Sequence, residues 1–258
     1  MVTTKLVGVL NYTHDSFSDG GEVYDTDSAV SVYNQLVQAG SEYVDIGAQS
    51  TSYGALQNSS EQEWGKLAPL LKALENLNRV SVDTYNYETA KRVVEAGVSM
   101  INDVSGGRDV KMLELIASNP QVNYVCMYSL TVPADKSVRI KNCNEIYDWF
   151  GQTVTRLTNA GIRNDQIILD PGIGFTTNPK QSFEIIQNAH KLREFGVAVM
   201  VGHSRKSYLE DITQLTPEER DLETTVASLH MYGKVDYLRV HNPSMHKRAF
   251  TAWHEINN

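Results

Sequence analysis

Cysteine is scarce in this chain, which has only two, Cys126 and Cys143, among its 258 residues. The two do not have the spacing of a metal-binding motif. Cys126 lies within a short apolar run, so we expect it to pack in the core as a small hydrophobic side chain. So little cysteine also fits a reducing compartment, and we expect a cytoplasmic protein.

Positive charge and long apolar runs are also in short supply. Lysine and arginine number 23 against 31 aspartate and glutamate residues, so the net charge is −8. This balance argues against a nucleic-acid partner or an anionic membrane surface, and an anionic substrate would need a local cationic pocket. No stretch approaches the ~20 apolar residues of a membrane span, and the apolar run after Lys5 is too short for a signal-peptide core.

Common catalytic motifs are absent as well. The sequence has no G-x-x-x-x-G-K-[ST] phosphate loop, no G-x-G-x-x-G, no H-E-x-x-H and no G-x-S-x-G. Residues 202–206 come near the last motif, but Lys206 stands where its second glycine would be. The seven histidines show no metal-ligand pairing. Four of them fall in helical patterns and are expected at the surface: His190, His230, His246 and His254.

What the chain does contain is an alternation of short apolar runs with segments of helical periodicity. The strand-like runs are 6–10, 42–46, 80–83, 98–101, 122–127, 166–169, 197–201 and 235–240. The helical patterns are 27–39, 60–77, 86–96, 109–118, 144–160, 180–195, 218–232 and 243–256. Such alternation indicates parallel strands with right-handed crossovers. Eight units favour an α/β fold made of one (β/α)8 TIM barrel over residues 1–258, rather than an open doubly wound sheet.

The strand-like runs end in polar or glycine-bearing tips, and local signals mark several helix ends. Ser59 or Ser60 can cap the helix at 60–77, and Gly97 can end the helix at 86–96. The active site of a (β/α)8 barrel lies at the carboxyl ends of its strands, so the tips should share one mouth. Two loops exceed the usual two to six residues, 11–26 and 128–142, and are expected there as lids or clamps.

Carboxylates and an amide are prominent among these tips. Asp83 and Asp170 each end an apolar strand, and the Pro171-Gly172 turn leaves the Asp170 side chain projecting from the strand. A buried carboxylate needs partners, which a heterocycle edge with two adjacent N–H donors would provide. Asn102 can donate and accept at once. The alternatives are a helix N-cap for Asp83 and a turn residue for Asn102.

Cations follow the last two strands. Residues 204–207, Ser-Arg-Lys-Ser, could open the seventh helix, and loops after strands 7 and 8 of such barrels often bind phosphate. Arg239 and His241 lie two apart, so their side chains should point the same way. Together these residues would place three cationic or basic groups around one phosphate-sized space, unless they form a solvated basic rim. Asn11 ends the neighbouring first strand, and its amide oxygen could help hold a Mg²⁺ that bridges a diphosphate.

Seven of these tips, taken together and in order, resemble the motifs of the dihydropteroate synthase family between about residues 6 and 242. They are LNYTHDSFSDGG, DIGAQST, SVDTY, INDVSGG, LDPGIGF, VGHSRKS and LRVHN. That family joins a hydroxymethyl-dihydropterin diphosphate to p-aminobenzoate and releases pyrophosphate in folate biosynthesis. The resemblance implies a TIM barrel, a homodimer, Mg²⁺ as cofactor and a target of sulfonamides.

The resemblance also implies a role for each matching residue. The pterin pocket would consist of Asp83, Asn102, Asp170 and Lys206, with Arg239 over the pterin face. The diphosphate and Mg²⁺ would be held by Asn11, Arg239 and His241. Ser207, Phe175 and the tail of Lys206 would lie near the aminobenzoate. Phe17 and Asp19 of the first loop would close over the site, and Thr51 would be a further substrate-binding residue. Of these residues, Lys206, Arg239 and His241 would be the catalytic ones.

Departures from the family pattern fall on the arylamine half. The family has Thr-Arg-Pro after the second strand, whereas this chain has Thr51-Ser52-Tyr53. The change removes a positive charge near the leaving group and alters a wall near the aminobenzoate. Other departures are Gly47-Ala48-Gln49, Met127-Tyr128-Ser129 and His14. Two alternatives therefore stand beside a working synthase: a pterin-binding paralogue with altered or no arylamine transfer, and a methyltetrahydrofolate-dependent methyltransferase.

Overall fold

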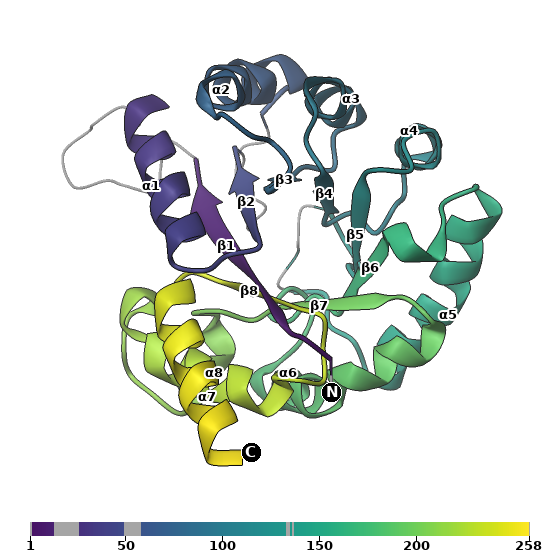
Figure 1. Cartoon of the computed structure of the whole chain (residues 1–258). Helices are drawn as coiled ribbons and strands as arrows, with labels where there is room; N and C mark the ends of the chain where they lie inside the picture. The colour runs from purple at the N-terminus through teal and green to yellow at the C-terminus, as the bar shows by residue number, and fades with distance from the viewer. Residues whose placement is uncertain (1, 13–25, 49–57, 133–134, 136, 258) are drawn as a thin grey trace.

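Eight parallel strands close into a barrel in the order of the sequence (Figure 1). The computed structural model describes residues 2–12, 26–48, 58–132, 135 and 137–257. The strands are β1 (Lys5–Asn11), β2 (Tyr43–Gly47), β3 (Val80–Asp83), β4 (Met100–Asp103), β5 (Asn123–Met127), β6 (Ile167–Asp170), β7 (Ala198–Gly202) and β8 (Tyr237–Val240). Pairing of β1 with β8 closes the barrel, so the predicted (β/α)8 fold is confirmed.

Helices surround the strands on the outside of the barrel (Figure 1). The α-helices are α1 (Thr26–Gln38), α2 (Ser60–Ala73), α3 (Tyr87–Ala96), α4 (Val110–Ala117), α5 (Asn144–Asn159), α6 (Pro179–Asn188), α7 (Asp221–Met231) and α8 (Pro243–Asn257). The 3-10 helices are η1 (Asn164–Gln166), η2 (Ala189–Phe195), η3 (Ser207–Asp211) and η4 (Pro217–Glu219). In the described part of the chain, none of the helices has the length and apolarity that crossing a membrane requires.

Two helix boundaries confirm the signals found in the sequence. Ser59 caps α2, because its hydroxyl accepts from the backbone N–H of Gln62 while the Gln62 side chain accepts from the Ser59 N–H. Gly97 follows α3 with a φ of 103°, in the left-handed region where a side chain would be strained. The start of α2 and the end of α3 are therefore determined by local sequence.

Alternate strand residues point into the barrel and form an apolar layer beneath a polar one. The apolar layer consists of Val7, Met100, Val125, Ile168 and Met200. Two residues further along their strands, Asn102, Asp170 and Gly202 reach the carboxyl end of the barrel, because strand side chains alternate with a period of two. The floor of the mouth is therefore a packed core, and the polar tips stand on it.

Two predictions about the last third of the chain need correction. The predicted helix at 180–195 is α6 only up to Asn188 and continues as η2. Residues 204–207 do not open the seventh helix, since η3 and η4 intervene before α7 begins at Asp221. The reason is local: Arg205 takes a φ of 61°, and a left-handed residue cannot continue into a right-handed α-helix.

The expected surface position of His246 is also wrong, because this side chain is fully buried. Its Nδ1 donates to the carbonyl oxygen of Asn242 at 2.8 Å, and its Nε2 lies 2.9 Å from the hydroxyl of Ser228. Both ring nitrogens thus have partners inside the protein, which allows a polar ring to be buried between α7 and α8.

Candidate active site

Asp45 of β2 lies at the centre of the polar layer and is fully buried. Its Oδ2 accepts hydrogen bonds from Nε of Arg239 at 2.6 Å and from Nδ2 of Asn102 at 2.9 Å. Its Oδ1 accepts from the hydroxyl of Ser81. One buried carboxylate therefore fixes the side chains of two residues that the sequence assigns to the pterin pocket.

Asp83 lies beside Asn102 in the register of β3 and β4. Its Oδ2 is 3.5 Å from Nη2 of Arg239, while its Oδ1 is buried without a hydrogen-bond partner among the residues that the structure describes. Burial and the neighbouring carboxylate of Asp45 raise the pKa of Asp83 to about 7, although the guanidinium opposes them. A buried oxygen in this state is an acceptor suited to a ligand N–H.

The alternative role of Asp83 as a helix cap does not hold. Asn86 caps α3, since its side chain accepts a hydrogen bond from the backbone N–H of Glu88 at 3.0 Å. Asn102 is likewise more than a turn residue, because it is 4% exposed and donates to Asp45. Both side chains are therefore available to shape the mouth.

Asp170 projects into the mouth from the end of β6. Its Oδ1 accepts from the backbone N–H of Gly172 at 2.8 Å, a bond within the Asp-Pro-Gly turn. A Cβ on Gly172 would collide with the carbonyl oxygen of Tyr128, so only glycine fits there. A Cβ on Gly202 would lie 3.2 Å from Oδ2 of Asp170, so this glycine keeps space open beside the carboxylate. Burial raises the pKa of Asp170, and the positive charge of Lys206 opposes that rise.

Lys206 lies against the loop that follows β6. Its Nζ donates to the carbonyl of Ile173 at 2.6 Å and stands 4.5 Å from the centroid of the Phe175 ring. Burial lowers the pKa of Lys206 to about 8, although the carboxylate of Asp170 favours the charged form. The ammonium and the ring together form one wall of the mouth.

The predicted single cluster of cations is divided in the structure. Arg239 reaches across the barrel to β2 and β3, whereas His241 turns toward the β7–α7 loop, with Nδ1 2.9 Å from Oγ of Ser204. β8 ends at Val240, so the alternation of side chains along the strand does not extend to His241. The two side chains therefore do not point the same way.

A cavity of about 600 Å³ opens beside His241. Its polar lining includes Asn11, Ser204, Arg205, Glu218 and Asn242. Burial and the guanidinium groups of Arg239 and Arg205 lower the pKa of His241 to about 3, so its imidazole is neutral at pH 7. The cavity brings together Asn11 and His241, two of the three residues that the family resemblance assigns to a diphosphate and its metal ion; the third, Arg239, is not part of its lining.

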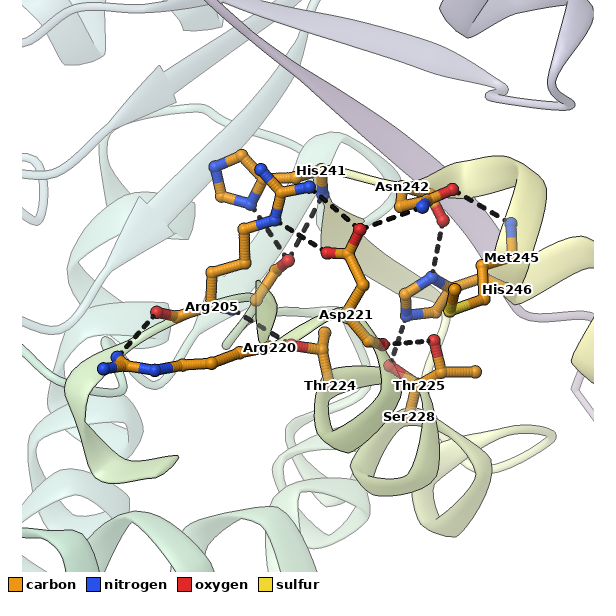
Figure 2. Close-up of polar contacts among 11 residues, drawn as sticks. Arg205, Arg220, Asp221, Thr224, Thr225, Ser228, His241, Asn242, Met245 and His246 are labelled. Carbon is orange, nitrogen blue, oxygen red and sulfur yellow. Dashed lines mark hydrogen bonds and ion pairs between the residues drawn. The ribbon is translucent and has the colours of Figure 1, made fainter. Parts of the chain in front are cut away.

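Arg205 adjoins this cavity and is held from several sides (Figure 2). Its φ of 61° lies in the left-handed region, which costs a residue with a side chain roughly 1–3 kcal/mol. Its Nε and Nη2 donate to the carboxylate of Asp221 at 2.7 and 2.9 Å, and its backbone N–H donates to Thr224 Oγ1 at 3.1 Å. These contacts stabilise an otherwise unfavourable conformation of the β7–α7 loop.

The remaining predicted residues are more scattered. Ser207 is the exposed first residue of η3, next to Lys206. Thr51, Phe17 and Asp19 lie outside the described residues. Tyr128, one of the departures from the family pattern, is 2% exposed and packs with its ring centroid 5.2 Å from that of Trp149 on α5. That substitution therefore alters the wall between β5 and the outer helices.

Two residues at the site were not assigned a role from the sequence. Asp45 is a charged residue inside the apolar run YVDIG, and a buried carboxylate there requires a cation, which Arg239 supplies. That signal was present in the sequence. Asp221 falls in the acidic stretch PEERDLE, where nothing distinguishes it from the solvated charges around it.

The residues of the cavity fit a metal ion that arrives with its substrate. No group of three His, Cys, Asp or Glu side chains suited to a metal occurs within the described ranges. Asn11 is one of the residues that line the cavity, and its side chain carries an amide oxygen. Mg²⁺ is commonly bound by one or two protein oxygens together with waters and substrate phosphates, which is the donor set that this cavity and a diphosphate would provide.

Known proteins resemble this chain over nearly its whole length. The family model described as pterin binding enzyme matches residues 7–241. The dihydropteroate synthase of Clostridium beijerinckii is 34% identical over 251 residues, which cover 95% of this chain and 91% of the relative. The type-3 dihydropteroate synthase of Escherichia coli is 33% identical over 248 residues, covering 93% and 94%.

Solved structures extend the similarity to the fold. Dihydropteroate synthase from Anaplasma phagocytophilum, with bound 6-hydroxymethylpterin-monophosphate, has a TM-score of 0.88 at 31% identity, covering 99% of this chain and 100% of that one. The Xanthomonas albilineans dihydropteroate synthase with 4-aminobenzoic acid has a TM-score of 0.90 at 29% identity, covering 99% and 93%. A match of this length, on the same closed barrel, shows that the chain belongs to the pterin-binding enzyme family.

Proposed function

We propose that this protein is a dihydropteroate synthase, which joins 6-hydroxymethyl-7,8-dihydropterin diphosphate to p-aminobenzoate and releases pyrophosphate. One observation carries the proposal. The buried Oδ1 of Asp83, which lacks a partner among the described residues, stands at the same carboxyl end of the barrel as a cavity that is lined by His241, Asn11 and residues of α1. A flat heterocycle in the mouth and a charged tail in the cavity would use both features.

The mouth supplies groups that complement a pterin. The carboxylates of Asp83 and Asp170 would accept from its adjacent N–H donors, and Lys206 would donate to its carbonyl. Arg239 is 2.6 Å from Asp45 and 3.5 Å from Asp83. The weaker contact is the one that a ligand N–H would replace, which leaves Arg239 on Asp45 with its planar guanidinium over the ring.

The proposed chemistry needs no nucleophile from the protein. The bond from the exocyclic methylene carbon to the diphosphate oxygen breaks, a bond from that carbon to the arylamine nitrogen forms, and the nitrogen loses a proton. Because the pterin ring can stabilise positive charge on the methylene, departure of pyrophosphate can run ahead of attack. The absence of nucleophile motifs in the sequence agrees with this route.

The residues of the cavity would then act on the leaving group. Asn11 would hold Mg²⁺, which supplies positive charge to the diphosphate when bound. The neutral imidazole of His241 can donate a hydrogen bond to a phosphate oxygen from Nε2 if Nδ1 accepts from Ser204. Arg239 is close enough to lower the pKa of His241, so its charge also acts on this cavity.

The arylamine half rests on fewer described residues. Phe175 and Ser207 flank Lys206 on the side assigned to p-aminobenzoate. The Thr51-Ser52-Tyr53 departure lies outside the described residues and favours a second candidate, a paralogue that binds pterin but transfers an altered arylamine or none. A methyltetrahydrofolate-dependent methyltransferase is disfavoured by the SFSDGG and SRKS segments, which resemble the synthases.

A pyrophosphate-release assay separates these candidates. We expect release when the protein is given the pterin diphosphate, p-aminobenzoate and Mg²⁺, and dependence of the rate on all three. Binding of the pterin diphosphate without release would leave the paralogue standing. Ser52→Arg, which restores the family's arginine, should then strengthen pyrophosphate binding if the second-strand loop faces the leaving group.

The proposal includes a cytoplasmic homodimer. Leu222 and Val226 on α7 are 64% and 60% exposed, and Ile256 on the neighbouring α8 is 79% exposed. Exposed apolar side chains on packed neighbouring helices offer surface for a protein interface. Light scattering should give twice the mass of one chain, and Val226→Asp should shift the mass toward that of a single chain.

A further inference from the structure

Asp221, the first residue of α7, joins two loops at the carboxyl end of the barrel (Figure 2). Its carboxylate accepts from Nε and Nη2 of Arg205 at 2.7 and 2.9 Å, and its Oδ2 also accepts from Nδ2 of Asn242 at 2.9 Å. Arg205 belongs to the loop after β7, and Asn242 belongs to the turn between β8 and α8. These three residues are termed the Asp221 bridge.

Both loops carry residues of the proposed active site. Lys206 follows Arg205 directly, and His241 precedes Asn242. Ser204 Oγ lies 2.9 Å from Nδ1 of His241 and accepts from its backbone N–H at 3.2 Å. The loops are therefore joined twice, once by Ser204 and His241 and once by the bridge, whose Arg205 and Asn242 also line the cavity.

The backbone of Arg205 depends on helix α7 for its conformation. Arg205 is the one residue with a positive φ, apart from glycines, in the described part of the chain. Its N–H donates to Thr224 Oγ1 at 3.1 Å, and its carbonyl accepts from Nη1 of Arg220 at 3.3 Å. A left-handed conformation of a residue with a side chain is stable where several contacts hold it. At Arg205 the contact of the guanidinium with Asp221 adds to the two backbone hydrogen bonds.

Asn242, at the other end of the bridge, directly precedes the first residue of helix α8. Oδ1 of Asn242 accepts from the backbone N–H of Met245 at 3.1 Å, and its carbonyl accepts from Nδ1 of His246 at 2.8 Å. The Asn242 amide is thereby fixed with its nitrogen toward Asp221. A change in Asp221 would act on the turn that carries His241 as well as on the loop that carries Lys206.

We propose that Asp221 is a positioning residue for the diphosphate end of the active site. By joining Arg205 to Asn242, it sets the separation of Lys206 and His241 without touching the substrate. The inference rests on the proposed function for the identity of the ligand. The positioning itself is a property of the fold and of binding, so it can be measured without turnover.

Asp221→Asn tests the inference with little change in shape. Its amide nitrogen must face a donor of Arg205 or of Asn242, so at least one contact of the bridge is lost. We expect the affinity for 6-hydroxymethyl-7,8-dihydropterin diphosphate with Mg²⁺ to fall about tenfold in calorimetry, because small misplacements of binding groups are costly. The affinity for 6-hydroxymethylpterin, which lacks the diphosphate, should stay within about twofold of wild type.

Asp236→Asn is the matched control. Asp236 pairs with Arg193 at 3.2 Å and accepts from the backbone N–H of Val199 at 2.9 Å, at the amino end of the barrel. Its side chain is 20% exposed, against 15% for Asp221. The control should lower the free energy of unfolding but leave both affinities unchanged. Equal losses in the two variants, or a loss for both ligands in Asp221→Asn, would mean general destabilisation and would overturn the inference.

A readout without ligand separates this inference from the proposed function. The ring nitrogen signals of His241 in nitrogen-15 NMR report its hydrogen bond to Ser204, and we expect Asp221→Asn to shift them while Asp236→Asn does not. Unchanged signals overturn the inference even if the protein proves to be a synthase. A shift supports it even if no pyrophosphate is released. Arg205→Lys, which keeps the charge but loses the bidentate contact, should shift them in the same direction if Asp221→Asn does not fold.

Discussion

The carboxylates of the mouth and the carboxylate of the Asp221 bridge face the same cation type, yet they differ in how fully they are paired. Both oxygens of Asp221 accept from Arg205, and these bonds, with that from Asn242, hold its pKa below the usual value even though burial opposes them. Asp83 shares Arg239 with Asp45, and burial raises its pKa to about 7. The incompletely paired Asp83 is where a ligand would supply the missing hydrogen bond. The fully paired Asp221 instead fixes the residues around that ligand.

Next to the Asp221 bridge lies a hydrogen-bonded series of four neutral side chains, here called the frame: His246, Ser228, His203 and Tyr208. The donor and acceptor of each of its hydrogen bonds can be assigned. The carbonyl of Asn242 can only accept, so Nδ1 of His246 donates to it and Nε2 accepts from Ser228. Ser228 in turn accepts from Nε2 of His203, whose Nδ1 accepts from the Tyr208 hydroxyl at 3.0 Å. Burial lowers the pKa of His203 to about 3. These four side chains stay uncharged at neutral pH, whereas Asp83 in the mouth, with its pKa raised to about 7, titrates there.

The largest expected effect lies in the mouth. Asp170→Asn turns an acceptor into a donor that faces the donors of a pterin, so we expect 6-hydroxymethylpterin binding to weaken by about 2–4 kcal/mol in calorimetry. Asp165→Asn is the control, because Asp165 is an exposed partner of Arg163 just before β6. An affinity equal to wild type in Asp170→Asn would remove the mouth from the pterin site.

The next effect lies in the frame and depends on pH. The folded pKa of His203 is lowered, so its contribution to stability is present above pH 6.5 and is lost as pH falls from 6.5 toward 3. Relative to His203→Gln, wild type should lose about 2 kcal/mol of unfolding free energy between pH 6.5 and pH 5. Urea denaturation at both pH values measures this difference. His190→Gln, at an exposed position of η2, should follow the wild-type dependence.

The positions of the mouth residues could be predicted from the sequence because topology determines them. Once eight parallel strands close, Asp83, Asn102, Asp170 and Arg239 must share one end of the barrel. Their pairing could not be predicted in the same way. That Arg239 reaches Asp45 across the barrel depends on the stagger of the strands and on a rotamer, neither of which leaves a local pattern.

The burial of His246 in the frame and the conformation of Arg205 in the Asp221 bridge were not predicted from the sequence, for two different reasons. The burial of His246 had a signal, because Phe250 lies four residues later and so shares its face of α8, and both are buried. The left-handed backbone of Arg205 had none, since that conformation is typical of glycine and depends on contacts from α7. Periodicity reports which face of a helix is buried, but it does not report a loop held by tertiary contacts.

A smaller effect tests how far the charge of Asp45 raises the pKa of Asp83. Asp45→Asn removes a negative charge next to Asp83, so the pKa of Asp83 should fall from about 7 by roughly one unit. A titration followed by carbon-13 NMR of the Asp83 carboxyl measures it. Asp221→Asn serves as the comparison and should leave that pKa unchanged. A pKa that stays at about 7 in Asp45→Asn would show that burial alone raises it.

The smallest effect lies where the two regions meet. Ser204→Ala removes one hydrogen bond to the ring of His241, which should weaken binding of the pterin diphosphate by about 1 kcal/mol, or roughly fivefold, and leave 6-hydroxymethylpterin binding unchanged. Ser99→Ala is the control, since the Ser99 hydroxyl donates to the backbone carbonyls of Asn78 and Val80 at the other end of the barrel. If Ser204→Ala weakened 6-hydroxymethylpterin as much as Asp170→Asn does, the mouth and the cavity would be one continuous binding site. The frame would then support the pterin ring directly, and the contrast between an unpaired mouth and a paired frame would no longer separate binding from positioning.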